Sequence, residues 1–118
     1  MRKEDITALF DNLLSNAYEA AEKSTERYII LTVLREDEDA MLIKLANSCD
    51  TPPAKNADGK YVTTKDVSLG HGVGLNSIMN CVDRYSGQIS MVYNHEEKTF
   101  TTVIIMKKTR REEKKHRK

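Results

Sequence analysis

The sequence predicts an α+β fold, a two-layer sandwich in which a mixed or antiparallel sheet packs against helices. Two segments repeat apolar residues at the three- and four-residue spacing of an amphipathic helix. Four short runs are typical of strands, either because they are rich in β-branched and aromatic residues or because their apolar residues alternate. These runs come in consecutive pairs instead of alternating singly with helices, which favours an α+β arrangement over a doubly wound sheet.

The first predicted helix runs from Asp5 to about Lys23. Its apolar residues gather on one face, at Ile6, Leu9, Phe10, Leu13, Leu14, Ala17 and Ala21. Two strands are predicted next, from Tyr28 to Leu34 and from Ala40 to Ala46, with the polar sequence REDED between them.

The segment from Ser48 to Leu69 shows no apolar periodicity. It contains two prolines, a glycine and many charged residues, so we predict a loop of roughly twenty residues. A loop of this length inside a compact domain is commonly a lid or a binding loop. We expect a lid here, because a cluster of glycines follows directly.

The second helix is predicted after the sequence GHGVG. Its apolar positions are Leu75, Ile78, Met79, Val82 and Tyr85. Gly87 is expected to end this helix as its C-cap. The runs from Gln88 to Tyr93 and from Thr99 to Met106 are then two strands separated by the polar NHEEK, most simply a hairpin.

Length and charge indicate one domain with a basic tail. The 118 residues are enough for one domain and too few for two. The 19 Lys and Arg nearly balance the 18 Asp and Glu, so the whole chain has no bias toward nucleic acid or membrane. Eight of the basic residues lie in 107–118. We divide the chain into a domain at 1–106 and a tail at 107–118, expected to be a solvated terminus, with membrane or RNA contact as alternatives.

The cysteines and the hydropathy pattern suggest a reducing compartment. Cys49 and Cys81 are far apart and share no CxxC spacing, so neither a disulfide framework nor a zinc site is expected. The longest apolar run is far below the ~20 residues of a membrane-spanning helix. The N-terminal MRKEDI leads into no signal-peptide hydrophobic region. We therefore expect this part to be soluble and cytoplasmic.

The first candidate site lies on the first helix. At 100° per residue, Asn12, Asn16 and Glu19 fall within about 60° of one another, beside the apolar face. Asparagine is a mediocre helix former, and amide oxygens are hard ligands that suit Mg²⁺. A surface helix that merely carries amides is the alternative interpretation.

The second candidate site is the glycine run GHGVGL, which opens the second helix. Alternating glycines let backbone N–H groups approach phosphates, and the helix N-terminus adds partial positive charge. A flexible hinge would also use glycines, so the run alone is weak evidence. Its spacing is not the GxGxxG dinucleotide fingerprint, and the GK[ST] of a P-loop is absent.

Taken together, these motifs resemble the GHKL superfamily of gyrase, heat-shock chaperone, histidine kinase and mismatch-repair ATPases. DNLLSNAYEA is similar to the N box of histidine kinases, LGHGVGLNSI to their G2 box, and YSGQISM followed by KTFTTVIIM to their closing helix end and hairpin. The resemblance covers about Asp5 to Met106 and implies the GHKL type of sandwich with a long ATP lid. TTKDVSLGHGVGL is most similar to peptide-pheromone quorum-sensing kinases of the agr type.

The resemblance implies roles for individual residues. Asn16 would coordinate Mg²⁺, and Asn12 would lie beside the phosphates of ATP. Lys65 would contact a phosphate, with a solvated lid lysine as the alternative. The remaining residues implied in nucleotide binding are Asn47, Gly70, His71, Gly72, Gly74 and Leu75.

The sequence departs from the family pattern in two places. Most such kinases carry DxGxG where this chain has ANSCD, so Asn47 would replace the aspartate that accepts from the adenine amino group. Gyrase-like members carry a general-base glutamate four residues before the Mg²⁺ asparagine, where this chain has Asn12. An amide cannot take a proton from water, so the combination favours phosphoryl transfer to a protein acceptor over rapid hydrolysis.

The resemblance therefore implies the catalytic domain of a sensor histidine kinase. It would bind ATP and Mg²⁺ and pass the γ-phosphate to a histidine on a separate dimerisation domain, with a response regulator downstream and no nucleic-acid partner. His71, His95 and His116 stand outside any phosphoacceptor helix and are expected to be bystanders. The domain would be the cytoplasmic part of a membrane-anchored sensor. A stand-alone serine kinase of the anti-sigma type and a non-catalytic nucleotide-binding module remain alternatives.

Overall fold

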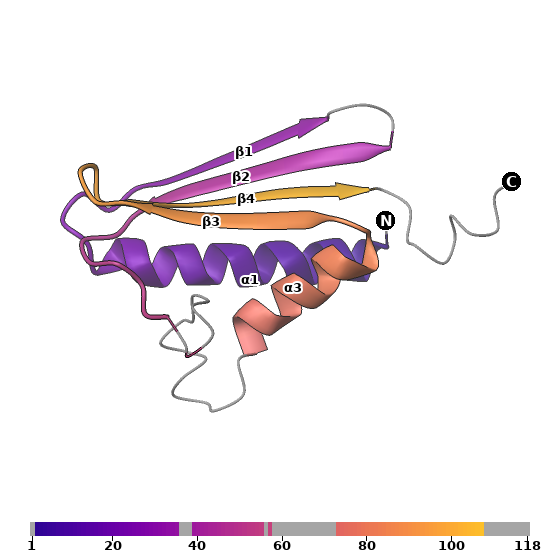
Figure 1. Cartoon of the computed structure of the whole chain (residues 1–118), viewed down its shortest axis with the longest axis horizontal. Coiled ribbons are helices and arrows are strands. Elements are labelled where there is room, and N and C mark those ends of the chain that lie inside the picture. Colours follow the sequence, from indigo (N-terminus) through magenta and orange to yellow (C-terminus); the bar gives the residue numbers. More distant parts are fainter. Residues whose placement is uncertain (1, 36–38, 56, 58–72, 108–118) are drawn as a thin grey trace, which may run out of the picture.

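In the part of the chain that the structure describes, two helices cover one face of a four-stranded sheet (Figure 1). The computed structural model describes residues 2–35, 39–55, 57 and 73–107. The helices are α1 (Lys3–Glu22) and α3 (Val73–Arg84). The strands are β1 (Ile29–Arg35), β2 (Ala40–Ser48), β3 (Gln88–Asn94) and β4 (Thr99–Lys107). The predicted α+β two-layer sandwich is confirmed.

The sequence placed these elements to within about two residues of their observed bounds. The largest consequence is at the end of β2, which continues beyond Ala46 to Ser48. Ser48 was predicted to begin the long loop, but it pairs with Thr99 of β4 and belongs to the sheet. Most of the remaining loop, 58–69, lies outside the described residues.

The sheet has the strand order β1-β2-β4-β3, and all three pairings are antiparallel. Of the two arrangements that the sequence left open, the described strands therefore form the antiparallel one. The last hairpin is present, but β4 lies inside the sheet, between β2 and β3. This leaves β1 and β3 as the two edges.

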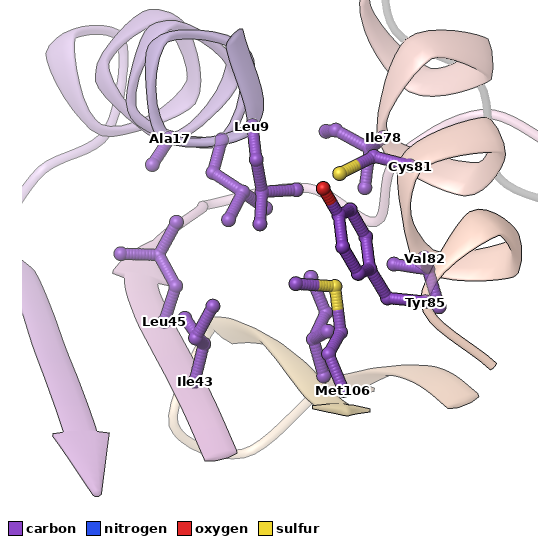
Figure 2. Packing of buried hydrophobic residues seen from close by; sticks show 11 residues of the cluster. Leu9, Ala17, Ile43, Leu45, Ile78, Cys81, Val82, Tyr85 and Met106 are labelled. Atoms are coloured by element: carbon purple, nitrogen blue, oxygen red, sulfur yellow. The ribbon is translucent and has the colours of Figure 1, made fainter. Parts of the chain in front are cut away.

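The hydrophobic core lies between the helices and this sheet. From α1 it takes every fourth residue, and from the central strands it takes the side chains of alternate residues, because strand side chains point to opposite faces. Figure 2 shows the core side chains converging from both layers. The buried cluster comprises Leu9, Leu13, Ala17, Ile43, Leu45, Ile78, Cys81, Val82, Tyr85, Ile104 and Met106.

A polar cluster joins the N-terminal end of α1 to the C-terminal end of α3. The carboxylate of Asp5 accepts hydrogen bonds from the Arg84 guanidinium, at 3.0 Å, and from the Tyr85 hydroxyl. That hydroxyl accepts in turn from the backbone N–H of Arg2 at 3.0 Å. Because Tyr85 is fully buried, its hydroxyl needs these partners, and they fix where α3 crosses α1.

The turn that follows α3 corrects one prediction. Gly87 was expected to be the C-cap, but the left-handed residue is Ser86, with φ 55°. The backbone N–H of Gly87 donates to the carbonyl of Val82 at 2.8 Å, and that of Ser86 donates to Asp83 at 3.0 Å. These two bonds form a Schellman motif, with Ser86 in the position that glycine usually takes.

Gly87 is needed for a different reason, which is the space available beside β4. A Cβ atom at position 87 would lie 2.4 Å from the carbonyl oxygen of Ile105, and also close to Met106 and Val82. The first of these contacts is with backbone, so a side chain could fit only if β3 or β4 moved. Glycine therefore allows the chain to pass from α3 into the sheet.

We expect substitutions at these two neighbouring positions to have opposite effects on stability. Gly87→Ala should lower the free energy of unfolding by roughly 1–3 kcal/mol, because the added methyl overpacks the turn against β4. Ser86→Gly should raise it by up to about 1 kcal/mol, because glycine adopts the left-handed conformation without strain. Urea unfolding followed by circular dichroism measures both changes. A Gly87→Ala variant as stable as the parent would contradict the close approach.

Candidate functional site

The two asparagines of the predicted site lie on the flank of α1 that faces α3. At 100° per residue, Asp5, Asn12 and Asn16 fall within about 40° of one another on the helix. Asp5 contacts Arg84 and Tyr85 at the end of α3, so this flank faces that helix. Both asparagines are half-buried. They therefore lie at the rim of the core and not on a free helix surface.

Asn16 has an unusual environment for an amide. Its side-chain oxygen is buried and has no hydrogen-bond partner within the described structure. Leaving a buried acceptor without a partner costs roughly 1–3 kcal/mol. Such groups are uncommon in folded proteins, and each calls for an explanation such as a bound ion or water. A hard cation or a hydrogen-bond donor beside α1 would supply the missing interaction.

The start of α3 brings part of the glycine run to the same side of the molecule. α3 begins at Val73, so Gly74 and Leu75 belong to its first turn. In Figure 1 its C-terminal end lies by the N-terminal end of α1, and its N-terminal end is level with the middle of α1. The first turn of a helix has backbone N–H groups without partners in the helix, which attract anions. Gly70, His71 and Gly72, like Lys65, lie outside the described residues.

Asn47 lies in β2, on the sheet face that carries the helices. Asn47 comes two residues after Leu45 in the strand, so both side chains point to the core side of the sheet. The Asn47 side chain is buried, and the residue is only 4% exposed. Its side-chain N–H donates to the carbonyl of Ser48 at 3.0 Å. This bond sets the orientation of the amide, with the nitrogen held by the backbone.

A network of hydroxyl groups holds the end of β2 that carries Asn47. The Ser24 hydroxyl, just after α1, lies 2.7 Å from that of Ser48. The Ser48 hydroxyl accepts from the backbone N–H of Tyr28 at 2.8 Å, and that of Ser24 from Arg27 at 3.1 Å. Sequence reasoning missed these serines, because Ser24 belongs to no motif and Ser48, although it lies in ANSCD, was predicted to begin the loop. Their role depends on contacts between the helix end and the strand.

Asp50, the last residue of ANSCD, is used in a contact with the loop after α1. Its carboxylate accepts from the backbone N–H of Thr25 at 3.0 Å and from the Thr25 hydroxyl at 2.8 Å. These two hydrogen bonds, helped by the nearby charge of Lys98, lower the pKa of Asp50. The carboxylate therefore stays charged and fastens the loop to the end of the sheet.

The cysteines and the one described histidine show no features of a reactive site. Burial raises the pKa of both the Cys49 and the Cys81 thiols, which disfavours the nucleophilic thiolate. His95 lies in the exposed turn between β3 and β4, as predicted, with its ring edge-on to Tyr93 at a centroid distance of 4.9 Å. His71 and His116 lie outside the described residues.

Comparison with known families identifies the class of protein. The model of the GHKL domain family matches residues 1–107, so the chain belongs to that family. The resemblance to GHKL proteins seen in the sequence is thereby confirmed, and the chain is a GHKL ATP-binding domain. No curated protein matches it. Within the described residues, no helix is long and apolar enough to cross a membrane.

Proposed function

We propose that this chain is the ATP-binding catalytic domain of a sensor histidine kinase, similar to quorum-sensing kinases of the agr type. It would present the γ-phosphate of ATP to a histidine on a separate dimerisation domain, in a signalling system that continues to a response regulator. The observation that carries the proposal is the buried amide oxygen of Asn16, which has no hydrogen-bond partner and lies on the flank of α1 facing α3.

The residues on this flank fit a magnesium nucleotide. The Asn16 amide oxygen is a hard ligand of the kind Mg²⁺ takes in proteins, and coordination would satisfy an acceptor that is otherwise left alone. Mg²⁺, when bound, neutralises charge on the phosphoryl group that is transferred. Asn12, one turn earlier, would lie beside the phosphates.

The phosphate contacts would be completed by the segment that leads into α3. Backbone N–H groups near Gly74 and Leu75, in the first turn of this helix, are suited to phosphate oxygens. We include Gly70, His71 and Gly72 in the same group, and we propose a contact from Lys65, because the family motif covers them.

Asn47 is our candidate for adenine recognition. Its side-chain nitrogen donates to the Ser48 carbonyl, which directs the amide oxygen to act as the acceptor. That oxygen would receive a hydrogen bond from the adenine amino group, as the aspartate of a DxGxG motif does. The serine network between Ser24 and Ser48 would keep the strand end in place for this contact.

The same residues favour transfer to a protein over hydrolysis. Asn12 occupies the position of the base in gyrase-like ATPases, and its amide cannot accept a proton from an attacking water. The domain would therefore position ATP and leave the nucleophile to its acceptor domain. We place it in the cytoplasmic part of a membrane-anchored kinase, with no nucleic-acid partner. A serine kinase of the anti-sigma type is the second candidate, since it shares the same boxes.

We expect Asn16→Ala to weaken binding of a non-hydrolysable ATP analogue by about tenfold or more in the presence of Mg²⁺, because one metal ligand is lost. Without Mg²⁺ the effect should be small. Calorimetry with and without the metal measures both affinities. The matched control is Asn80→Ala, which removes an exposed asparagine from α3 and should leave both affinities unchanged. Equal Mg²⁺-dependent affinity in a folded Asn16→Ala variant would refute this metal site.

We also expect the isolated chain to hold ATP without consuming it. Incubated with labelled ATP, it should neither hydrolyse the nucleotide quickly nor become phosphorylated on histidine, because Asn12 cannot act as a base and neither of the described helices carries a histidine. Addition of a histidine-bearing dimerisation domain should yield acid-labile phosphate on that domain. Stoichiometric acid-labile phosphate on His71, His95 or His116 would contradict the proposal. Acid-stable phosphate on serine of an added protein would favour the second candidate.

A further inference from the structure

The edge strand β1 exposes apolar side chains on both of its faces. Five of its seven residues are large and apolar, and each is between 36% and 57% exposed, namely Ile29, Ile30, Leu31, Val33 and Leu34. Pairing with β2 is continuous along the strand, so no bulge interrupts it. Charged residues, prolines and bulges usually protect a sheet edge from pairing with another strand. Within β1, only the terminal Arg35 offers such protection.

The opposite edge of the sheet is different. β3 alternates between half-buried and exposed positions, and its exposed residues are polar except for Val92. Its other apolar side chains pack toward the core. The residue pattern of β3 is therefore that of a sheet edge exposed to solvent. The residue pattern of β1 is that of a strand covered by another part of a protein.

The exposed apolar surface of β1 continues onto α1. Leu14 and Tyr18 lie one turn apart and are 38% and 60% exposed. Around the helix axis, these two residues are rotated by roughly 160–240° from Asn12 and Asn16, so they lie on the other side of the helix. α3 lies on the Asn12 side, so Leu14 and Tyr18 lie on the flank toward β1.

The pairing with β2 shows which residues of β1 belong to this surface. Ile29, Leu31 and Val33 are opposite Asn47, Leu45 and Ile43, whose side chains face the helices. α1 packs chiefly on β2 and only lightly on β1, so the helix covers these three side chains incompletely. We call Leu14, Tyr18, Ile29, Leu31 and Val33 the β1 surface.

We propose that a second copy of this chain covers the β1 surface by pairing its own β1 antiparallel to the first, with Thr32 at the twofold axis. The two sheets would then join into one sheet of eight strands. In this register Leu31 lies opposite the partner's Val33, Ile30 lies opposite the partner's Leu34, and Thr32 lies opposite the partner's Thr32. Each of these pairs joins like with like on the same face, which stabilises an antiparallel ladder. A twofold interface requires such self-complementarity.

Charge selects the antiparallel direction. Arg35 is the one charged residue in β1, and the antiparallel register places it opposite the partner's Ile29. The two arginines then lie at opposite ends of the paired strands. A parallel pairing in the same register would place them side by side, where like charges destabilise the pair.

The dimensions of the layers fit this arrangement. Strands in a sheet are about 4.8 Å apart, so β2 and the partner's β2 would be separated by roughly 14 Å. An α-helix with its side chains is about 10–12 Å wide. The two α1 helices would therefore lie nearly in contact. Leu14 from both copies would face the space beneath the β1 pair, and Tyr18 would line the side of the helix contact that points away from the sheet. The flanks with Asn12, Asn16 and α3 point away from the interface, so both candidate nucleotide sites would stay open.

Paired charge substitutions test both the dimer and its register. Leu31→Lys combined with Val33→Lys places like charges opposite each other across the twofold axis. We expect the dimer dissociation constant of the 118-residue chain to rise at least about tenfold. Leu31→Lys combined with Val33→Glu places opposite charges there, and should recover most of the association. Sedimentation over about a hundredfold range of concentration measures each constant, because mass action makes a dimer concentration-dependent.

Two controls locate the contact at β1. Val92→Lys makes the same kind of change on the other edge strand and should leave the dissociation constant unchanged. Thr32→Cys should form a disulfide-linked dimer under mild oxidation, because the register places this residue opposite its own copy, whereas Ser90→Cys on β3 should form no disulfide link between copies under the same treatment. Circular dichroism checks that each variant is folded.

A parent chain that stays monomeric over the whole concentration range would overturn the proposal. The proposal would also be overturned if Val92→Lys weakened the dimer as much as the two lysine substitutions in β1 do. The same holds if Leu31→Lys combined with Val33→Glu failed to recover the association. Either result would place the interface elsewhere. Cross-linking through Ser90→Cys and not through Thr32→Cys would have the same meaning.

Discussion

The packing of Leu9, Leu13 and Ala17 against the sheet fixes the rotation of α1 about its own axis. Every fourth residue of this helix is buried, and the stripe they form can face the strands in only one orientation. Once this orientation is set, the two flanks of α1 acquire different surroundings. One flank faces α3 and carries Asn12 and Asn16, and the other faces β1 and carries Leu14 and Tyr18.

The two flanks also differ in what remains unsatisfied. On the side of α3, the buried amide oxygen of Asn16 lacks a hydrogen-bond partner. A cation or a hydrogen-bond donor could interact with this oxygen and remove the cost of burying it. On the side of β1, apolar side chains and the unpaired backbone groups of a strand edge are exposed. Another strand could cover these side chains and pair with this edge. Both features oppose stability in the isolated chain. Departures of this kind from local rules tend to mark functional or interaction sites.

The sequence predicted the elements well because their signals are local. The apolar stripe of α1 and the β-branched runs of the strands depend on residues close together in the chain, and their ends were correct to within about two residues. Ser48 was wrongly placed in a loop, because it pairs with Thr99, which lies 51 residues later in the chain. Gly87 was wrongly given the left-handed position, because glycine is the usual residue there, while the close approach of Ile105 could be seen only in the folded chain.

The candidate site was predictable in part for the same reason. Helix geometry alone brought Asn12 and Asn16 together on one flank, but the burial of the Asn16 oxygen depends on how the helices pack. The bonds between Ser24 and Ser48, and between Asp50 and Thr25, join segments whose proximity is set by the end of the sheet. Ser48 and Asp50 both lie in ANSCD, but that segment alone does not show which residues they contact.

The central claim is that the flank of α1 facing α3 holds a metal-bound nucleotide through Asn16. The most direct measurement replaces Mg²⁺ by paramagnetic Mn²⁺, together with a non-hydrolysable ATP analogue, and follows the side-chain amide signals of all asparagines by NMR. Coordination through Asn16 predicts the strongest broadening at the Asn16 side-chain signal, with weaker effects on Asn12 and on asparagines farther from the metal, such as Asn94 in β3. An Asn16 signal that stays sharp while the nucleotide is bound would contradict the account.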